Sequence, residues 1–390
     1  MSVTYELIAP CFFGCESTAS FELRRLGAED LRVTDGRLTF RGGAEMIAAA
    51  NLNLRTVERV LLLLASYRAE TFDDLFDGVY AIPWEELLPA DAAFPVKGSS
   101  LNSKLSSVPA CQSIIKKAIV KRLMRGHRTS VLPETGSEYR VQFLLRKDLC
   151  EIMLDTSGEG LHKRGYRRNA MEAPLRETLA ATIADLGRVR RDSVVEDPFC
   201  GSGTLVIEAA QKALNMAPGL QRRFAAERYS FVPPEVWAAQ RQKALAEIRQ
   251  DAAFEGFGYD IDPAAVELAR ANARLAGVDK RCHFEVADVK DFAPSSEAIV
   301  LTNPPLRRAD EHHRRRRPAG PDLWPADGGP PLRRGLRHHG RYGVRGALWP
   351  PRRQAPQDVQ RDDPLPGVYV LRCAVGRQGK AHAGPLPGRI

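Results

Sequence analysis

The sequence predicts an α/β protein built from three folded units, and three observations point to this fold class. The chain has 390 residues, which favours two or three domains over one. Residues 173–302 alternate short apolar strands with amphipathic helices, a pattern typical of a doubly wound parallel sheet. The net charge also changes in blocks, from −7 over residues 1–91 to +9 over 92–170 and −4 over 171–305. One basic block therefore lies between two acidic ones.

The first expected unit covers residues 1–68 and is a small α/β fold. Its Asp35-Gly36 pair is a good hairpin turn, and Ser17 is a plausible helix cap. The expected elements are, in order, a strand over 5–9, a helix over 16–26, strands over 31–34 and 37–40, a helix over 43–53 and a strand over 59–67. This order is typical of a ferredoxin-like half-barrel.

The second expected unit covers residues 69–160 and is an α+β fold with a basic surface. Its expected elements are helices over 73–80 and 83–88, a strand over 93–97, a helix over 110–125 and strands over 139–145 and 148–154. On the long helix, Lys117, Lys121 and Arg125 recur every four residues, opposite an apolar face. A solvated helix face is the simpler interpretation of one basic helix. The surrounding block is so rich in bases that we favour a phosphate-binding surface made of Lys97, Lys104, Lys116, Lys117, Lys121, Arg122, Arg125, Lys163, Arg164 and Arg167.

The third expected unit covers residues 161–305 and holds the doubly wound sheet. Its expected strands are 193–196, 254–259, 283–286 and 298–302, and its expected helices are 204–214 and 263–276. The stretch 215–253 is longer than a normal crossover and contains a further helix over 235–248.

A glycine-rich turn follows the first strand of this sheet and opens a helix. Its sequence, Asp197-Pro198-Phe199-Cys200-Gly201-Ser202-Gly203-Thr204, allows the backbone to approach a ligand at the carboxyl edge of the sheet. No Gly-Lys-Ser/Thr follows, which excludes a phosphate loop, and the three-glycine dinucleotide spacing is absent. Taken alone, a glycine pair is more often a simple turn.

Carboxylates follow the next two strands. Asp260 is placed to accept hydrogen bonds from a ribose diol, and Asp288 to contact an adenine amino group. Asp262 lies before Pro263, so a helix cap is the simpler interpretation of this residue. Ligand-compatible residues at the ends of three successive strands favour a nucleoside-containing cofactor.

Asn303, Pro304 and Pro305 follow the fourth strand. Two prolines restrict the backbone, so that the Asn oxygen and nearby carbonyls can hold an exocyclic amine with its lone pair aimed at a methyl donor. A strand-terminating turn is the alternative for this tripeptide alone. At the end of strand four, it is typical of amino-group methylation with S-adenosyl-L-methionine.

Residues 306–390 differ in composition from the rest of the chain. They hold 17 Arg, 1 Lys, 12 of the 27 prolines and no Phe, with runs such as HHRRRRPAGP that have no periodicity. Only 367–375 could pass as a strand. We expect this tail to be disordered. A natural basic tail is an alternative, but translation of GC-rich DNA out of frame from about Pro305 or Leu306 explains the composition better.

Targeting and metal signals are missing from the sequence. No stretch approaches 18 apolar residues, and the N-terminus lacks a basic segment followed by an apolar one. The seven cysteines show no repeated spacing, and Cys11 and Cys15 have no second pair nearby. We therefore expect a cytoplasmic protein without metal or membrane.

Seven segments together resemble the THUMP-domain class I methyltransferases. They are FPVKGSSLNSKLSSVPACQSIIKKAIVKRL, LDTSGEGLHKRGYR, APLRETLAA, DPFCGSGTLVIEAA, NMAPGLQRRF, GYDIDP and TNPP. The most similar type is the bacterial guanine-N2 methyltransferase of 23S ribosomal RNA, often labelled an N6-adenine-specific DNA methylase. The resemblance runs from about residue 3 to Pro305 and ends at Leu306, where the family has an aromatic residue that stacks on the target base.

The resemblance implies a ferredoxin-like domain, a THUMP RNA-binding domain and a Rossmann-like catalytic domain. It implies catalytic positions at Asn303, Pro304 and Pro305 and a partner that is structured RNA, ribosomal RNA in the type case. It also implies S-adenosyl-L-methionine held by Asp197, Phe199, Gly201, Gly203, Thr204, Asp260, Asp262 and Asp288. Two alternatives remain open, an N6-adenine DNA methyltransferase and an inactive RNA-binding remnant.

Overall fold

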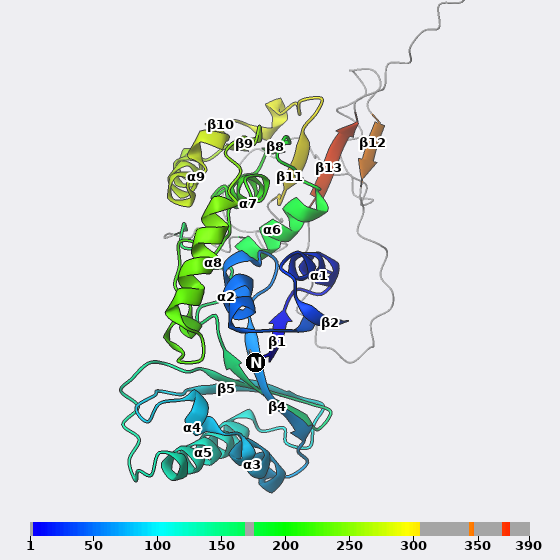
Figure 1. The fold of residues 1–390 in the computed structure, drawn as a ribbon. Helices are drawn as coiled ribbons and strands as arrows, with labels where there is room; N and C mark the ends of the chain where they lie inside the picture. Colours follow the sequence, from blue (N-terminus) through cyan, green and yellow to red (C-terminus); the bar gives the residue numbers. More distant parts are fainter. Residues whose placement is uncertain (1–2, 168–174, 305–342, 347–368, 375–390) are drawn as a thin grey trace, which may run out of the picture.

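The structure, a computed structural model, describes residues 3–167, 175–304, 343–346 and 369–374. Two sheets lie in successive layers of an elongated molecule (Figure 1). The sheet of the third unit lies at one end, the helices of the second unit lie at the other, and the first unit is between them. Within these ranges, no helix combines the length and apolar character needed to cross a membrane.

The first unit folds largely as its sequence predicts. Its elements are β1 (Tyr5–Pro10), α1 (Glu16–Arg25), β2 (Glu29–Thr34), β3 (Arg37–Gly42), α2 (Ala44–Asn53) and β4 (Leu61–Arg68). Gly36 has a φ of +73°, which suits the expected hairpin turn. The prediction that Ser17 caps this helix is wrong, because α1 begins at Glu16 and Ser17 lies inside it. Cys15 occupies the cap position without a side-chain hydrogen bond.

The second unit continues the sheet of the first. Its elements are α3 (Phe72–Ala81), α4 (Trp84–Leu87), β5 (Val96–Leu101), α5 (Val108–Gly126), β6 (Val141–Arg146) and β7 (Leu149–Asp155). Since β4 pairs with both β1 and β7, all seven strands form one sheet in the order β2-β3-β1-β4-β7-β6-β5. The strand expected over 93–97 lies instead at β5, because Val96, rather than Ala93, begins the parallel pairing with β6.

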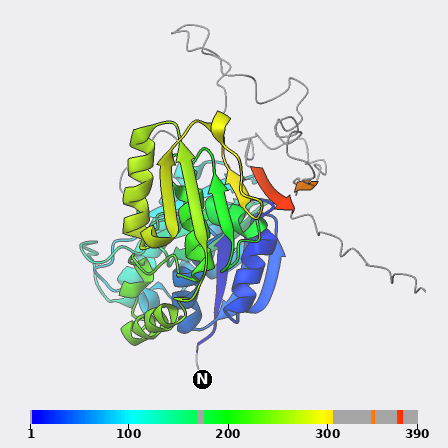
Figure 2. The same cartoon turned by 90° about the horizontal axis from the view of Figure 1, so that it is seen from above.

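The third unit contains the expected parallel sheet. Its elements are α6 (Glu177–Leu186), β8 (Val194–Asp197), α7 (Thr204–Ala213), η1 (Ala225–Arg228), α8 (Pro234–Ala246), β9 (Glu255–Asp260), α9 (Pro263–Ala276), η2 (Asp279–Arg281), β10 (Cys282–Val286), η3 (Val289–Asp291) and β11 (Ile299–Thr302). Strands β10, β9, β8 and β11 are neighbours in that order and run parallel. Figure 2 shows these strands side by side with their helices. The sequence analysis did not specify helix α6 or the short 3-10 helices η1, η2 and η3.

Two strands from the tail extend this sheet. The backbone of β13 (Tyr369–Ala374) pairs antiparallel with β11, and β12 (Gly343–Gly346) pairs with β13. The strand expected over 367–375 is therefore confirmed, while β12 was not foreseen. The expectation that the whole tail is disordered is therefore wrong for these two segments. The remaining residues of 306–390, including those on which the expected disorder and frame shift rest, lie outside the described residues.

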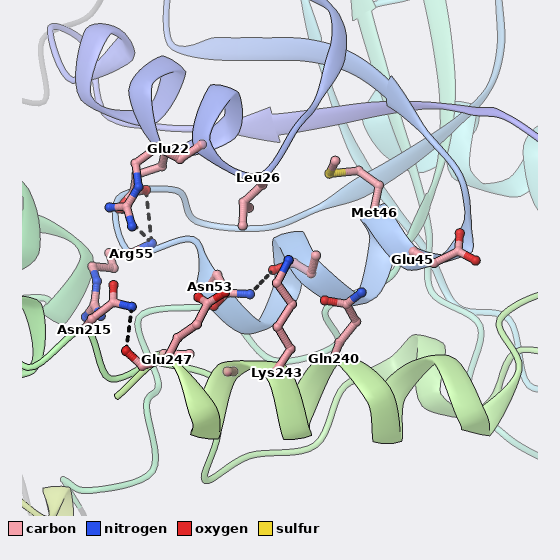
Figure 3. A pocket seen from close by; sticks show the side chains of 14 residues that line it. Glu22, Leu26, Glu45, Met46, Asn53, Arg55, Asn215, Gln240, Lys243 and Glu247 are labelled. Carbon is pink, nitrogen blue, oxygen red and sulfur yellow. Dashed lines mark hydrogen bonds between the residues drawn. The ribbon is translucent and has the colours of Figure 1, made fainter. Parts of the chain in front are cut away.

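The long insertion 215–253 ties the catalytic unit to the first two. Phe224, Tyr229 and Trp237 belong to the hydrophobic core of residues 7–161, and α8 packs along α2 (Figure 1). The Tyr229 hydroxyl donates to the Asp155 carbonyl at 2.7 Å. A hollow of about 180 Å³ between α1, α2 and α8 carries mixed charges, among them Glu22, Lys243 and Glu247 (Figure 3). These contacts of residues 215–253 fix the second unit relative to the sheet of the third unit.

Candidate functional site

The expected site residues gather at one edge of the catalytic sheet. Parallel strands place their carboxyl ends at the same edge, so Asp197, Asp260 and Asn303 lie at or just after the ends of three adjacent strands. The register places Val300 of β11 beside Glu196 of β8. Asp288 follows β10 at the same edge. The structure therefore brings together the four positions that the sequence analysis identified strand by strand.

The glycine-rich turn needs both of its glycines. Gly201 and Gly203 have φ values of +50° and +78°, a region in which residues with a Cβ are strained. A Cβ at Gly203 would lie 2.9 Å from the Phe284 ring, whereas a Cβ at Gly201 would meet nothing within 4 Å. The inner glycine therefore allows close packing, and the outer one leaves the backbone open to a ligand.

Asp260 holds the glycine-rich turn against β9. One of its carboxylate oxygens accepts from the Gly201 N–H at 2.9 Å and the other from the Asp262 N–H at 3.0 Å. Each oxygen keeps a further lone pair, so the carboxylate can still accept from a hydroxyl donor. The side chain thus orients the turn and remains available to a ribose diol.

Asp197 is buried beneath the same turn. It is 1% exposed and accepts from the Phe199 N–H at 3.1 Å. Burial, together with the nearby charge of Asp260, raises the pKa of Asp197 from 3.8 to about 7. Such a carboxyl group braces the turn from inside, and its predicted cofactor contact is not tested by this geometry.

Replacing Asp197 by Asn should change how stability depends on pH. The raised pKa means that the folded parent holds a proton between about pH 4 and pH 7 that the unfolded chain releases. The unfolding free energy of the parent should therefore fall relative to that of Asp197→Asn as the pH rises to about 7, and then level off. Urea unfolding of both proteins at pH 5, 6, 7 and 8 measures this difference. Parallel curves would show that Asp197 does not titrate in this range.

The two other carboxylates in the expected set are helix caps. Asp262 accepts from the Ala264 N–H at 2.9 Å and begins α9, as the simpler interpretation of its sequence suggested. Asp288 accepts from the Lys290 N–H at 3.0 Å and begins η3. Ile261, between Asp260 and Asp262, is 69% exposed. These caps hold the edge in place, and an apolar side chain is left open beside Asp260.

Asn303 places a polar side chain at the end of β11. Its side chain is half-buried and forms no hydrogen bond with any residue in the described part of the chain. Pro304 is buried behind it, and Pro305 lies outside the described residues. The arrangement leaves an amide at the end of β11 that can donate to, or accept from, a bound group.

One supporting residue was missed by the sequence analysis. Asn272 is 1% exposed, and its side-chain amide donates to the Ser202 carbonyl at 3.0 Å, which anchors the glycine-rich turn from α9. The available signal was a polar residue on the otherwise apolar helix face formed by Val266, Ala269, Ala273 and Ala276.

The ten expected RNA-binding residues divide into two groups. Six pair with an acid, as Lys104–Glu70, Lys116–Glu134, Arg122–Glu85, Lys163–Glu159, Arg164–Glu208 and Arg167–Glu177. Arg164 is 2% exposed, so including this side chain in an RNA-binding surface was wrong. Within the described ranges, Lys97, Lys117, Lys121 and Arg125 have no acidic partner, and all four are exposed.

Models of three protein families match this chain. An RlmL ferredoxin-like domain matches residues 6–61, a THUMP domain matches 69–155 and an RMKL-like methyltransferase domain matches 164–317. The three matches follow one another along the sequence and correspond to the three units of the structure.

Several known proteins are similar over most of the chain. "Putative RNA methyltransferase YpsC" of Bacillus subtilis is 42% identical over 304 residues, which are 77% of this chain and 79% of that protein. A solved structure named as a predicted N6-adenine-specific DNA methylase from Listeria monocytogenes has a TM-score of 0.76 and 41% identity, and it covers 80% of this chain and 82% of its own. A solved structure named "Crystal structure of SMU.472, a putative methyltransferase complexed with SAH" has a TM-score of 0.74 and 39% identity, and it covers 80% of this chain and 83% of its own.

Proposed function

Because the chain belongs to the RNA methyltransferases that join an RlmL-type ferredoxin-like domain, a THUMP domain and an RMKL-like methyltransferase domain, we propose that it methylates the exocyclic N2 amine of a guanine in ribosomal RNA. Its cofactor is S-adenosyl-L-methionine and its substrate class is RNA. The observation that carries the proposed target is the Asn303 amide at the end of β11, which has no hydrogen-bond partner among the described residues and lies at the edge that also holds the glycine-rich turn.

The residues at this edge fit S-adenosyl-L-methionine, which supplies an electrophilic methyl group when bound. The open face of Gly201 admits a ligand to the backbone, and Asp260 keeps lone pairs for a diol. The exposed Ile261 offers an apolar surface to a purine. Thr204 begins α7, whose N-terminus favours a negatively charged group. Phe199, Asp262 and Asp288 remain proposed members of this site.

Asp260→Ala should weaken cofactor binding roughly tenfold, because one charge-assisted acceptor is lost and the Gly201 N–H loses its partner. Asp260→Asn keeps one side-chain oxygen, so its cofactor affinity should lie between those of Asp260→Ala and the parent. Calorimetric titration with S-adenosylhomocysteine gives all three affinities. Equal affinities would limit Asp260 to a structural role.

Catalysis in this proposal is mostly positioning. The Asn303 oxygen accepts a hydrogen bond from the amine, whose nitrogen lone pair then faces the methyl group. Bound S-adenosyl-L-methionine would supply the methyl group to this nitrogen, and the Asn303 oxygen would keep the amine oriented while the nitrogen gives up its proton to solvent. The target base must leave its stack to reach a site at a sheet edge, so base flipping is expected.

Methyl transfer to ribosomal RNA and to duplex DNA tests this function directly. Tritiated methyl groups followed by nucleoside digestion identify both the polymer and the modified atom. The proposal expects N2-methylguanosine from RNA. N6-methyladenine from DNA would establish the rival activity instead, and label in neither polymer would support an RNA-binding remnant.

The basic face of α5 (Lys117, Lys121 and Arg125) is the proposed main contact with RNA. Changing all three to Glu should weaken RNA binding at least tenfold and flatten its dependence on salt, because several phosphate contacts are lost. Cofactor affinity should stay unchanged. Filter binding between 50 and 300 mM salt measures the effect, and Lys117→Arg/Lys121→Arg/Arg125→Lys is the charge-matched control. Unchanged RNA affinity in the Glu variant would place the RNA elsewhere.

We also propose that residues 306–390 are the product of a shifted reading frame. The match to the Bacillus relative covers 77% of this chain, and residues 306–390 differ in composition from the residues before them. Leu306 stands where the resembling family has an aromatic residue. Sequencing the gene across codon 305 would settle the frame directly.

A further inference from the structure

Three polar side chains of the segment between β7 and α6 turn into the catalytic unit. Arg164 and Tyr166 are 2% and 1% exposed, and the side chain of Arg167 is 12% exposed. Long polar side chains in a connecting segment normally reach solvent. Their burial here indicates that this segment has a role inside the molecule.

Two buried acids on neighbouring helices receive these side chains. Glu208 of α7 accepts from the Tyr166 hydroxyl at 3.0 Å and lies 3.6 Å from the Arg164 guanidinium. Glu177 of α6 accepts from Arg167 Nη2 at 3.1 Å. Each buried charge therefore has an opposite charge beside it. Because an unpaired buried charge is strongly destabilising, the positions of these side chains are tightly fixed.

The second terminal nitrogen of Arg167 reaches the glycine-rich turn. Nη1 donates to the Leu175 carbonyl at 3.0 Å and to the Thr204 hydroxyl at 3.4 Å. The Thr204 hydroxyl lies 3.1 Å from the Ser202 hydroxyl, inside the turn between Gly201 and Gly203. One guanidinium therefore joins α6, the chain before it and the first residue of α7. A line of hydrogen bonds runs from Arg167 to the turn.

We propose that Arg167 is a positioning residue of the methyl-donor site and that it acts through Thr204. The proposal rests on the assignment of the glycine-rich turn to the donor. Arg167 was expected on the RNA surface, but its guanidinium is committed to three acceptors within the protein. A planar fork of donors can serve these acceptors together, which a lysine ammonium at the end of a flexible chain does less well.

Binding measurements on the full chain separate a donor role from an RNA role. Arg167→Gln should weaken S-adenosylhomocysteine binding about tenfold in calorimetry, while RNA affinity in filter binding stays within twofold of the parent. Arg167→Lys should recover part of the lost affinity. Arg191→Gln is the matched control, because Arg191 pairs with Asp251 on the surface before β8 and should leave both affinities unchanged.

Thr204→Val provides a second approach that leaves no buried charge unpaired, should Arg167→Gln fail to fold. This variant should also weaken donor binding, and combining it with Arg167→Lys should add less than the sum of the two effects, because both interrupt one line of hydrogen bonds. Additive effects, or lost RNA affinity with unchanged donor affinity, would overturn the inference. A parent that binds no S-adenosylhomocysteine would overturn the proposed donor site as well, whereas a parent that binds it and an indifferent Arg167 would overturn the inference alone.

Discussion

The chain with its present residues 306–390 should transfer methyl groups roughly 100-fold more slowly than a version in which the reading frame after Pro305 is restored. Leu306 offers an aliphatic side chain where the resembling family stacks an aromatic ring on the flipped base. Such stacking contributes about 1–3 kcal/mol per base, and the upper value corresponds to about 100-fold. Single-turnover methylation of ribosomal RNA by the two versions measures the difference.

A third version, restored except for leucine at position 306, isolates the ring from the rest of the tail. If stacking is the main loss, this version should be nearly as slow as the present chain. The present chain already pairs the β11 edge of the sheet, since the β13 backbone is hydrogen-bonded to β11. Equal turnover by the present and restored chains would establish residues 306–390 as a genuine tail.

Local patterns in the sequence were sufficient to predict most of the fold. Alternating apolar residues, the Asp35-Gly36 turn and the apolar face of α5 each depend on near neighbours in the chain, and the structure has elements at these places. The seven-stranded sheet was not predictable in this way. It forms because β4 offers hydrogen bonds on both of its sides, and nothing in residues 61–68 indicates that the second partner is β7.

The candidate site divides along the same line. The carboxyl ends of parallel strands meet at one edge of a sheet whatever the packing around it. The shared location of Asp197, Asp260 and Asn303 could therefore be predicted from their places at the ends of strands. The ion-pair partners of the basic side chains could not be predicted from the sequence. A count of basic residues cannot distinguish Lys117, which has no acid beside it within the described residues, from Arg164, which is buried against Glu208. Ion pairs between segments distant in the sequence decide which Lys and Arg side chains remain available to bind RNA.

Asn303→Ala should lower the turnover of the frame-restored enzyme about 10²- to 10³-fold, because the amine would lose the group that orients its lone pair. Affinity for S-adenosylhomocysteine should change less than threefold, because the turn and Asp260 are untouched. Asn303→Asp is the matched control. It keeps a side-chain acceptor of the same length but no donor, and should retain more activity than Asn303→Ala if the oxygen is the group that matters. Asn303 forms no hydrogen bond within the described part of the chain, so neither change leaves a described partner unpaired. Full turnover by Asn303→Ala would reduce the tripeptide to a strand-terminating turn and remove the basis for the proposed target amine.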